Sequence, residues 1–334
     1  MHDTIRDQYK GKRVLITGGA GFIGSNIART LHALGAHIVV FDSFSPLYGG
    51  NRYNLRQLAN DRIELIQDDV RNVERLNSVV HAADIIVHLA AQVSYLDSGK
   101  VPFEDYDVTA RSTLHILEAI RRSGKKTKVL FSSSRMVLGE ARADVITEEH
   151  PTNPLTIYGV HKLTAEKYLQ IYYRDHDIPC TILRITNPYG PHQQVKHSKY
   201  SIVGWFVRCA MEGNSIRVFG QGKQKRDYIF IDDIVDAFVR AGCSRVCDGK
   251  IYNLGTGIST EFRHMAQTVV EVVGSGSIEH IPWPSDYERI ETGDLVVDVG
   301  RLRNDLGWTP RFDLRTGINR THEFLKEHLQ HYLT

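Results

Sequence analysis

The stretch Arg13-Val-Leu-Ile-Thr-Gly-Gly-Ala-Gly-Phe-Ile-Gly24 decides the fold of this chain. Its first residues form an apolar run that predicts a buried strand, and a helical pattern with one apolar face follows the glycines. Small residues between a strand and a helix let the backbone approach a pyrophosphate, whose charge the free N–H groups and the helix dipole can bind. The stretch therefore predicts a dinucleotide site formed by Gly18, Gly21, Phe22, Ile23 and Gly24.

Outward from this stretch, short β-branched runs alternate with longer amphipathic patterns. The runs at 13–17, 37–41, 62–66, 85–88 and 128–132 predict strands, and the patterns at 23–34, 105–122 and 157–174 predict helices. Strands that alternate with helices are parallel and are joined by right-handed crossovers. We therefore expect an α/β fold, a doubly wound parallel sheet of the Rossmann type, with its ligand crevice at the carboxyl ends of the strands.

The pattern becomes less regular from about Asn187. A polar loop is followed by a predicted helix at 201–212, by strands at 216–219 and 228–231, and by further helices at 232–241 and 260–273. We expect a cofactor-binding domain over residues 1–186, to which the chain returns near 228–254. Residues 187–334 should form mainly a smaller, substrate-binding lobe.

Composition and charge exclude several classes of protein. The chain has 334 residues, of which 42% are hydrophobic and 24% charged, so neither a disordered nor a fibrous protein fits. The net charge of +2 gives no bulk electrostatic reason to expect nucleic acid or an anionic membrane as a partner. The four cysteines are scattered outside any CxxC pattern, which argues against a disulfide scaffold or a bound metal. No apolar stretch is long enough for a signal peptide or a membrane span, so we expect a cytoplasmic protein.

Asp42 ends the second predicted strand, 18 residues after Gly24. A carboxylate at this place can accept hydrogen bonds from the adenosine ribose, and it would repel the 2′-phosphate of NADP. The alternative is that Asp42 only begins the loop that follows it. We favour the ribose interaction, and hence NAD as cofactor, because the glycines and the acid belong to one βαβ unit.

A second group of polar residues follows the strand predicted at 128–132. That strand runs into Ser132, Ser133 and Ser134, and Tyr158 and Lys162 follow one helical turn apart. A phenol needs a lowered pKa to act as a base at neutral pH, and we expect the adjacent ammonium to lower it. A serine hydroxyl can then hold the oxygen whose proton Tyr158 removes.

The order of these motifs resembles the extended short-chain dehydrogenase/reductases, specifically the NAD-dependent nucleotide-sugar epimerases and dehydratases. The resemblance implies that Ser134, Tyr158 and Lys162 are catalytic, and that the last two also contact the cofactor. It further implies that Asp69, Val70, Leu89, Ala90, Ala91 and Ser132 bind the cofactor, and that Ser134, Asn187, Arg226 and Arg289 bind the substrate. The alternative for Arg226 is a place in a solvated basic loop, and Arg289 lies one or two residues away from the position of the family's second phosphate-binding arginine.

The chain also departs from the family pattern. Thr109 stands in place of an asparagine, Leu138 in place of a tyrosine, and His161 in place of a small hydroxyl residue. Arg135 directly follows Ser134, where it could face a carboxylate on the sugar or simply anchor a loop.

The resemblance implies oxidation of a sugar at C4. The 4,6-dehydratases carry Asp-Glu after the catalytic hydroxyl residue and the uronate decarboxylases a glutamate, whereas this chain has Arg135 and Met136. We therefore expect a 4-epimerase, acting on a UDP-sugar as a homodimer that pairs the long helices. Another nucleotide-sugar enzyme (dehydratase, 2-epimerase, decarboxylase or keto-sugar reductase) and a non-catalytic NAD-binding regulator remain as alternatives.

Overall fold

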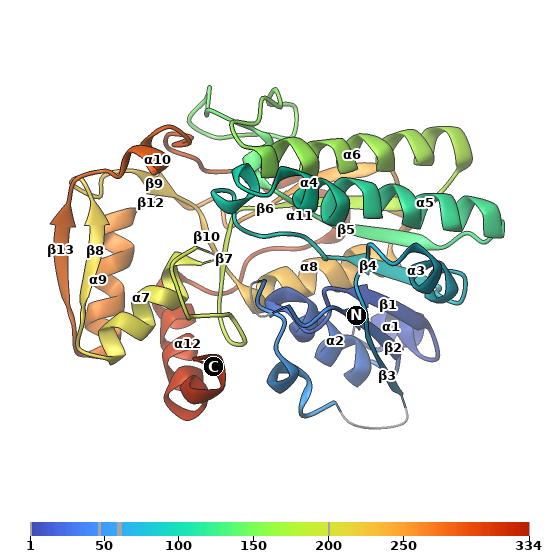
Figure 1. The fold of residues 1–334 in the computed structure, drawn as a ribbon, viewed down its shortest axis with the longest axis horizontal. Coiled ribbons are helices and arrows are strands. Elements are labelled where there is room, and N and C mark those ends of the chain that lie inside the picture. The colour runs from blue at the N-terminus through green and yellow to red at the C-terminus, as the bar shows by residue number, and fades with distance from the viewer. Residues whose placement is uncertain (1, 46–47, 59–61, 200, 334) are drawn as a thin grey trace.

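A parallel sheet with helices on both faces forms the larger part of the molecule (Figure 1). The computed structural model describes residues 2–45, 48–58, 62–199 and 201–333. Within these ranges the main sheet has seven strands in the order β11-β6-β5-β4-β1-β2-β3, and every pairing between them is parallel. The strands are β1 (Arg13–Thr17), β2 (His37–Asp42), β3 (Ile63–Gln67), β4 (Ile85–His88), β5 (Lys128–Ser134), β6 (Cys180–Ile185) and β11 (Lys250–Leu254). The expected doubly wound α/β fold is confirmed.

The strand order reverses between β1 and β4, and this reversal fixes the ligand crevice. From β1 the chain adds β2 and β3 on one side, and then returns to add β4, β5 and β6 on the other. The loops that leave β1 and β4 therefore diverge and open a crevice at their carboxyl ends.

Two apolar layers hold the helices against the sheet. One layer packs α1 (His2–Tyr9), α2 (Phe22–Ala33) and α8 (Ile231–Cys243) on one face, and the other packs α3 (Val73–Val80), α5 (Ser112–Ser123) and α6 (Ile157–His176) on the opposite face. The helix expected at 105–122 is α4 (Pro102–Tyr106) and α5, joined by a π-helical turn, η3 (Asp107–Arg111).

A smaller lobe lies at the left of Figure 1. Its parallel strands β8 (Ser215–Phe219) and β13 (Ser277–Ile281) pack with α7 (Ile202–Met211), α9 (Phe262–Val273) and α12 (Leu314–His328). Two short pairings link the lobes: β7 (Asn187–Tyr189) with β10 (Tyr228–Phe230), and β9 (Lys225–Arg226) with β12 (Thr260–Glu261). The remaining short helices include α10 (Ser285–Glu288) and α11 (Gly300–Leu306). Among the described residues, no helix is long and apolar enough to cross a bilayer.

Candidate active site

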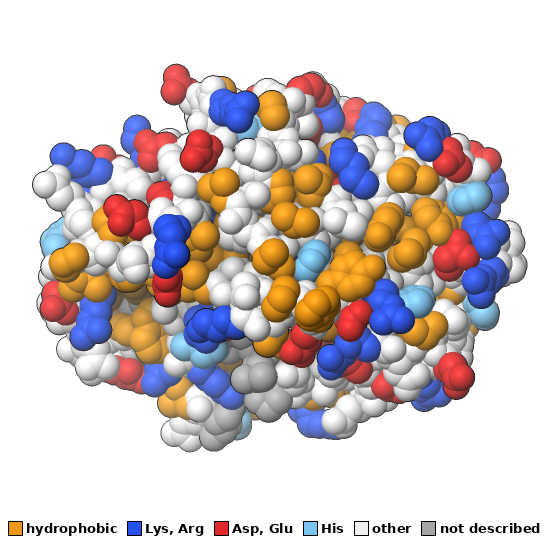
Figure 2. Space-filling model, turned by 45° about the horizontal axis from the view of Figure 1, so that its top comes forward, with side chains coloured by type: hydrophobic (Ala, Val, Ile, Leu, Met, Phe, Trp, Pro, Cys, Tyr) orange, Lys and Arg blue, Asp and Glu red, His pale blue; other side chains and the backbone are white. Residues whose placement is uncertain are grey.

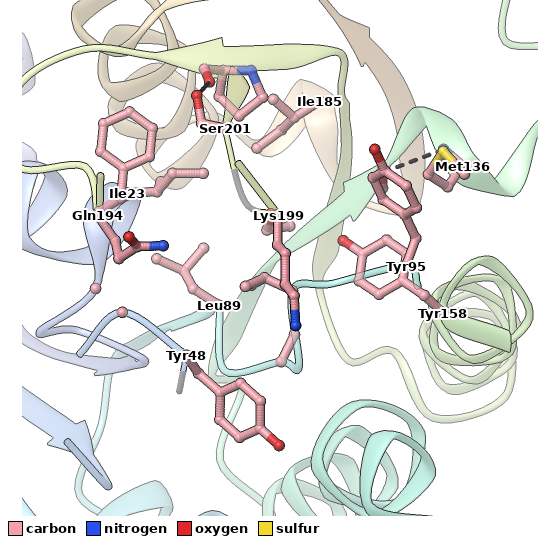
Figure 3. A pocket seen from close by; sticks show the side chains of 18 of the residues that line it. Ile23, Tyr48, Leu89, Tyr95, Met136, Tyr158, Ile185, Gln194, Lys199 and Ser201 are labelled. Atoms are coloured by element: carbon pink, nitrogen blue, oxygen red, sulfur yellow. Dashed lines mark hydrogen bonds between the residues drawn. The ribbon is translucent and has the colours of Figure 1, made fainter. Parts of the chain in front are cut away.

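One large cavity lies at the carboxyl ends of β1, β2, β4, β5 and β6 and extends toward the smaller lobe. Tyr158 and Tyr95 lie side by side at one end of it, and Ile23 and Leu89 lie toward the other (Figure 3). The cavity brings together the residues predicted for the cofactor and most of those predicted for the substrate.

The glycine turn forms a cradle in which side chains do not fit. A Cβ on Gly24 would lie 2.3 Å from the carbonyl oxygen of Gly18, so α2 can approach the turn only with glycine at this position. Gly18 has φ +68° and packs against the backbone of Ala90, where a Cβ would lie 3.0 Å from the nitrogen. The exposed backbone and the N-terminus of α2 suit the pyrophosphate of a dinucleotide. The residues present thus fit NAD.

Asp42 lines the same cavity at the end of β2. Its carboxylate accepts hydrogen bonds from the backbone nitrogen of Ala20 at 2.9 Å and from that of Phe44 at 2.8 Å. Burial raises the pKa of Asp42, and the two backbone N–H groups act against that rise. The side chain therefore shapes the loop and also lines the cavity, and its interaction with the ribose stays a prediction.

The other residues predicted to bind the cofactor lie on or directly after β3, β4 and β5 and line the cavity. They are Asp69 and Val70 after β3, Leu89, Ala90 and Ala91 after β4, and Ser132 on β5. Burial raises the pKa of Asp69, but hydrogen bonds from Arg71 outweigh it and leave the pKa lowered. His88 instead lies beneath the site, where it joins Thr17 to the helix layer through Thr113.

The three serines at the end of β5 have different partners. The carbonyl of Ser132 accepts a hydrogen bond from Lys162 Nζ at 2.7 Å. The hydroxyl of Ser133 donates to the buried carboxylate of Glu166 at 2.5 Å, which also pairs with Arg184. The hydroxyl of Ser134 lines the cavity, accepts a hydrogen bond from the nitrogen of Met136 at 3.2 Å, and lies close enough to Tyr158 to act to lower its pKa.

Tyr158 and Lys162 lie in the first turns of α6, and the local sequence explains their position. The Thr156 side chain caps the helix by accepting a hydrogen bond from the nitrogen of Gly159 at 3.1 Å. A Cβ on Gly159 would lie 2.5 Å from the carbonyl oxygen of Met136, so glycine lets the helix start lie close to the end of β5. This approach brings Tyr158 to Ser134 and Lys162 to Ser132.

Burial dominates the titration of both side chains. It raises the pKa of Tyr158 to about 12, while the Ser134 hydrogen bond and the charge of Arg135 act to lower it. It lowers the pKa of Lys162 to about 8, against the charges of Asp105 and Glu166. For the polypeptide's own groups the phenol pKa is raised, because the cost of burying the phenolate exceeds the contributions of Ser134 and Arg135. The lowering expected from Lys162 together with the nicotinamide stays a prediction.

A buried carboxylate, Asp105, lies behind the tyrosine and was not identified from the sequence. It is fully buried and accepts a hydrogen bond from the Thr109 hydroxyl at 3.2 Å, and its Oδ1 lies 3.4 Å from Nδ1 of His161. Two of the departures from the family pattern, Thr109 and His161, thus converge on one acid. The i, i+4 spacing of Asp105 and Thr109 was the available signal.

Not all residues that were predicted to bind the substrate line the cavity. Asn187 lines the cavity, but its amide donates to the carbonyl of Asp227 at 2.8 Å. Arg226 is 8% exposed, also lines the cavity, and pairs with Glu291 at 2.5 Å. Arg289 is exposed, pairs with Asp286, and is not among the lining residues. The structure brings Glu291, Thr292 and Tyr95 to this end instead, and sequence reasoning identified none of the three.

Comparison with known proteins agrees with this geometry. The family model described as "NAD dependent epimerase/dehydratase family" matches residues 14–255. A UDP-glucose 4-epimerase from Mycolicibacterium smegmatis is 34% identical over 95% of this chain and 100% of its own length. A UDP-N-acetyl-alpha-D-glucosaminuronate decarboxylase from Bacillus cytotoxicus is 29% identical over 95% of this chain and 98% of its own.

The solved structure of an epimerase from Methanothermobacter thermautotrophicus superposes with a TM-score of 0.90 at 27% identity, covering 98% of this chain and 96% of that one. Proteins named as dTDP-D-glucose 4,6-dehydratases also match, so the relatives share NAD-dependent chemistry on nucleotide sugars rather than one reaction. This chain belongs to the NAD-dependent epimerase/dehydratase family of nucleotide-sugar enzymes.

Proposed function

We propose that this enzyme is a 4-epimerase of a UDP-sugar that works through a transient 4-keto sugar. Residues 1–186, with the return to the sheet at β11, would hold NAD, and residues 187–334 would contribute most of the nucleotide-sugar site. The observation that carries the proposal is that Ser134 and Tyr158 line the same cavity, to which the described lining residues add no unpaired acid and base near Tyr158.

The carboxylates around the cavity support this choice. Those among the described lining residues are Asp42, Asp68, Asp69, Glu104 and Glu291. Asp42 ends β2, Asp68 and Asp69 follow β3, and Glu104 lies 3.8 Å from Arg71. Glu291 is paired with Arg226. A dehydratase needs a further acid and base to expel water, and no lining carboxylate near Tyr158 is available for that task.

The chain's own residues have distinct roles in the proposed reaction. The Ser134 hydroxyl holds the C4 oxygen, and Tyr158 takes its proton and later returns it. Lys162 keeps its charge at neutral pH, because its pKa of about 8 lies above 7, and it stabilises the ionised phenol. NAD supplies the hydride acceptor and donor, and its positive nicotinamide would favour the phenolate as well. Rotation of the keto sugar within the closed cavity would present its other face.

A label at C4 tests the reaction directly. UDP-sugars deuterated at C4 are incubated with the NAD-loaded enzyme, and products are followed by mass spectrometry and NMR. The proposal expects two isomers of equal mass, retained deuterium and no net NADH. Tyr158→Phe should fold and bind NAD but lose turnover by about 100-fold or more, because only the proton-transferring oxygen is removed. Loss of water or carbon dioxide from the product would contradict the proposal.

We also propose that the enzyme is a homodimer that pairs α4, α5 and α6 with their copies. This edge carries exposed apolar side chains, among them Phe103 at 83%, Val160 at 42% and Ile171 at 42%. Figure 2, with this side of the molecule turned toward the viewer, shows apolar side chains gathered across its middle. If α4-η3-α5 is counted as one interrupted helix, it and α6 would form a four-helix bundle with their copies across a two-fold axis and would cover these side chains.

A further inference from the structure

Arg135 has a place in the cavity that its sequence neighbours do not explain. It is the residue after Ser134, begins the short helix η4 (Arg135–Val137), and lines the cavity. Its Nη1 donates to the hydroxyl of Thr292 at 2.9 Å, which holds the guanidinium in place. Among the ion pairs of the described residues, none includes Arg135.

The neighbouring guanidinium of Arg226 has an ion-pair partner, which Arg135 lacks among the described residues. Arg226 donates to the carbonyls of Lys225 and Gly293 and pairs with Glu291 at 2.5 Å, so its charge is compensated within the protein. Burial and, to a smaller extent, the nearby charge of Arg226 together lower the pKa of Arg135 to about 10. The two guanidiniums thus share the carboxylate of Glu291, and a partly buried charge whose counterion is shared with a second cation is incompletely compensated. An anionic ligand group would complete that compensation.

A second orphaned group lies in the same region. The hydroxyl of Tyr228 is buried and has no hydrogen-bond partner, and the side chain is only 4% exposed. Tyr228 lines the cavity and lies within electrostatic reach of both Arg226 and Arg135. The Thr292 hydroxyl accepts from Arg135, which leaves its own proton available. The guanidinium and two hydroxyls are donors that suit a ligand oxyanion.

We propose that Arg135 binds a carboxylate on the sugar of the substrate, so that the preferred substrate is a nucleotide-linked uronate. This inference rests on the proposed function for the position of the sugar. If the C4 oxygen lies between Ser134 and Tyr158, a carboxylate on the adjacent ring carbon, C5, is directed to the residue that follows Ser134. The planar guanidinium matches a carboxylate with two parallel hydrogen bonds, which a neutral hydroxymethyl group cannot reproduce.

Binding to the NAD-loaded enzyme, measured by calorimetry, tests the inference with UDP, UDP-glucose and UDP-glucuronate. We expect UDP-glucuronate to bind about tenfold or more tightly than UDP-glucose, as suits a charge-assisted hydrogen-bonded pair. Arg135→Gln should remove most of this preference while leaving the affinities for UDP and UDP-glucose within about twofold. Arg135→Lys should restore the preference only in part, because lysine keeps the positive charge but cannot donate two parallel hydrogen bonds to the carboxylate.

The matched control is Arg217→Gln, which removes the same charge from the surface strand β8, where Arg217 lies 3.6 Å from Glu279. It should change no affinity, and NAD binding reports folding of every variant. Equal weakening of all three ligands by Arg135→Gln would place the guanidinium on the diphosphate and overturn the inference, as would equal affinity of the parent enzyme for both sugars. An Arg135-dependent preference together with carbon dioxide release would uphold it and contradict the 4-epimerase.

Discussion

At the residue scale, cofactor choice depends on Asp42. Its buried carboxylate would lie beside the adenosine ribose, where a 2′-phosphate would meet a like charge at low dielectric. We expect NAD to bind about 100-fold more tightly than NADP. Asp42→Asn should narrow this gap to about tenfold or less, because the amide oxygen can still accept a backbone N–H while the charge is lost. Calorimetric titration with both nucleotides measures the two affinities. If the ratio of NAD affinity to NADP affinity is the same in the variant as in the parent enzyme, Asp42 does not interact with the ribose.

Residues near the cofactor were easier to predict than those near the sugar. The glycine turn, Asp42, Ser134 and Tyr158 each follow a strand or begin a helix, so local spacing alone directs them to one edge of the sheet. Glu291 and Thr292 come from a loop after α10, more than 150 residues beyond Ser134 in the chain. Loop positions have no periodicity, so the pairing of Arg226 with Glu291 needed the structure.

At the element scale, the interrupted helix α4-η3-α5 brings the carboxyl group of Asp105 close to Tyr158, the proposed acid and base. Asp105 acts to raise the pKa of Tyr158 and that of Lys162. Asp105→Asn should therefore lower both, and since turnover needs the ionised phenol, the acid limb of kcat should move to lower pH. The pH profile of kcat measures this shift. Glu118→Gln on α5 is the control, because Glu118 bonds to Tyr172 and Arg121 at the surface. An acid limb that stays in place would show that Asp105 only supports packing.

Buried parallel strands were predictable where their apolar runs are continuous, as in β1 and β4. The expected boundaries of β1, β2, β4 and β8 lie within one residue of the observed ones. Strands β6 and β11 were missed. Arg184 interrupts β6 and is buried because Glu166 pairs with it, and Asn253 interrupts β11 and donates to the carbonyl of Ile146. Both polar residues make hydrogen bonds to partners from other elements, which a local pattern cannot show.

At the scale of the whole molecule, the proposed dimer can be tested by measuring the molar mass of the enzyme in solution. The parent enzyme should scatter light as a dimer at micromolar concentration. Phe103→Asp should shift it toward the monomer, because a charge would be buried at the helix face. Ile258→Asp is the control: Ile258 is 59% exposed and lies between β11 and β12, away from α4 and α6. A parent enzyme that remains monomeric would contradict the dimer and would mean that the α4–α6 face stays in solvent.

The stability of the whole chain should also depend on pH through buried histidines. Burial lowers the pKa of His88 to about 3 and that of His192 to about 2, and the charges of Lys162 and Arg29 act in the same direction on the first and the second respectively. The unfolded chain binds these protons near pH 6.5. Between that value and the folded pKa the unfolded state holds more protons, so stability is complete above pH 6.5 and is lost as pH falls.

For His88 this linkage amounts to about 2 kcal/mol between pH 8 and pH 5. Urea unfolding of His88→Gln should show a decrease over that range that is smaller than the parent's by about this amount. The variant should also be less stable at pH 8, because Thr17 and Thr113 lose a partner. As a control, His81→Gln at an exposed position should show the same decrease in the free energy of unfolding between pH 8 and pH 5 as the parent. NMR titration gives a direct reading on the folded parent, in which the His88 ring should stay neutral down to pH 5. Protonation of that ring between pH 5 and 7 would contradict the argument, because the hydrogen bonds that join β1 and β4 to α5 would then tolerate a charge in the centre of the sheet.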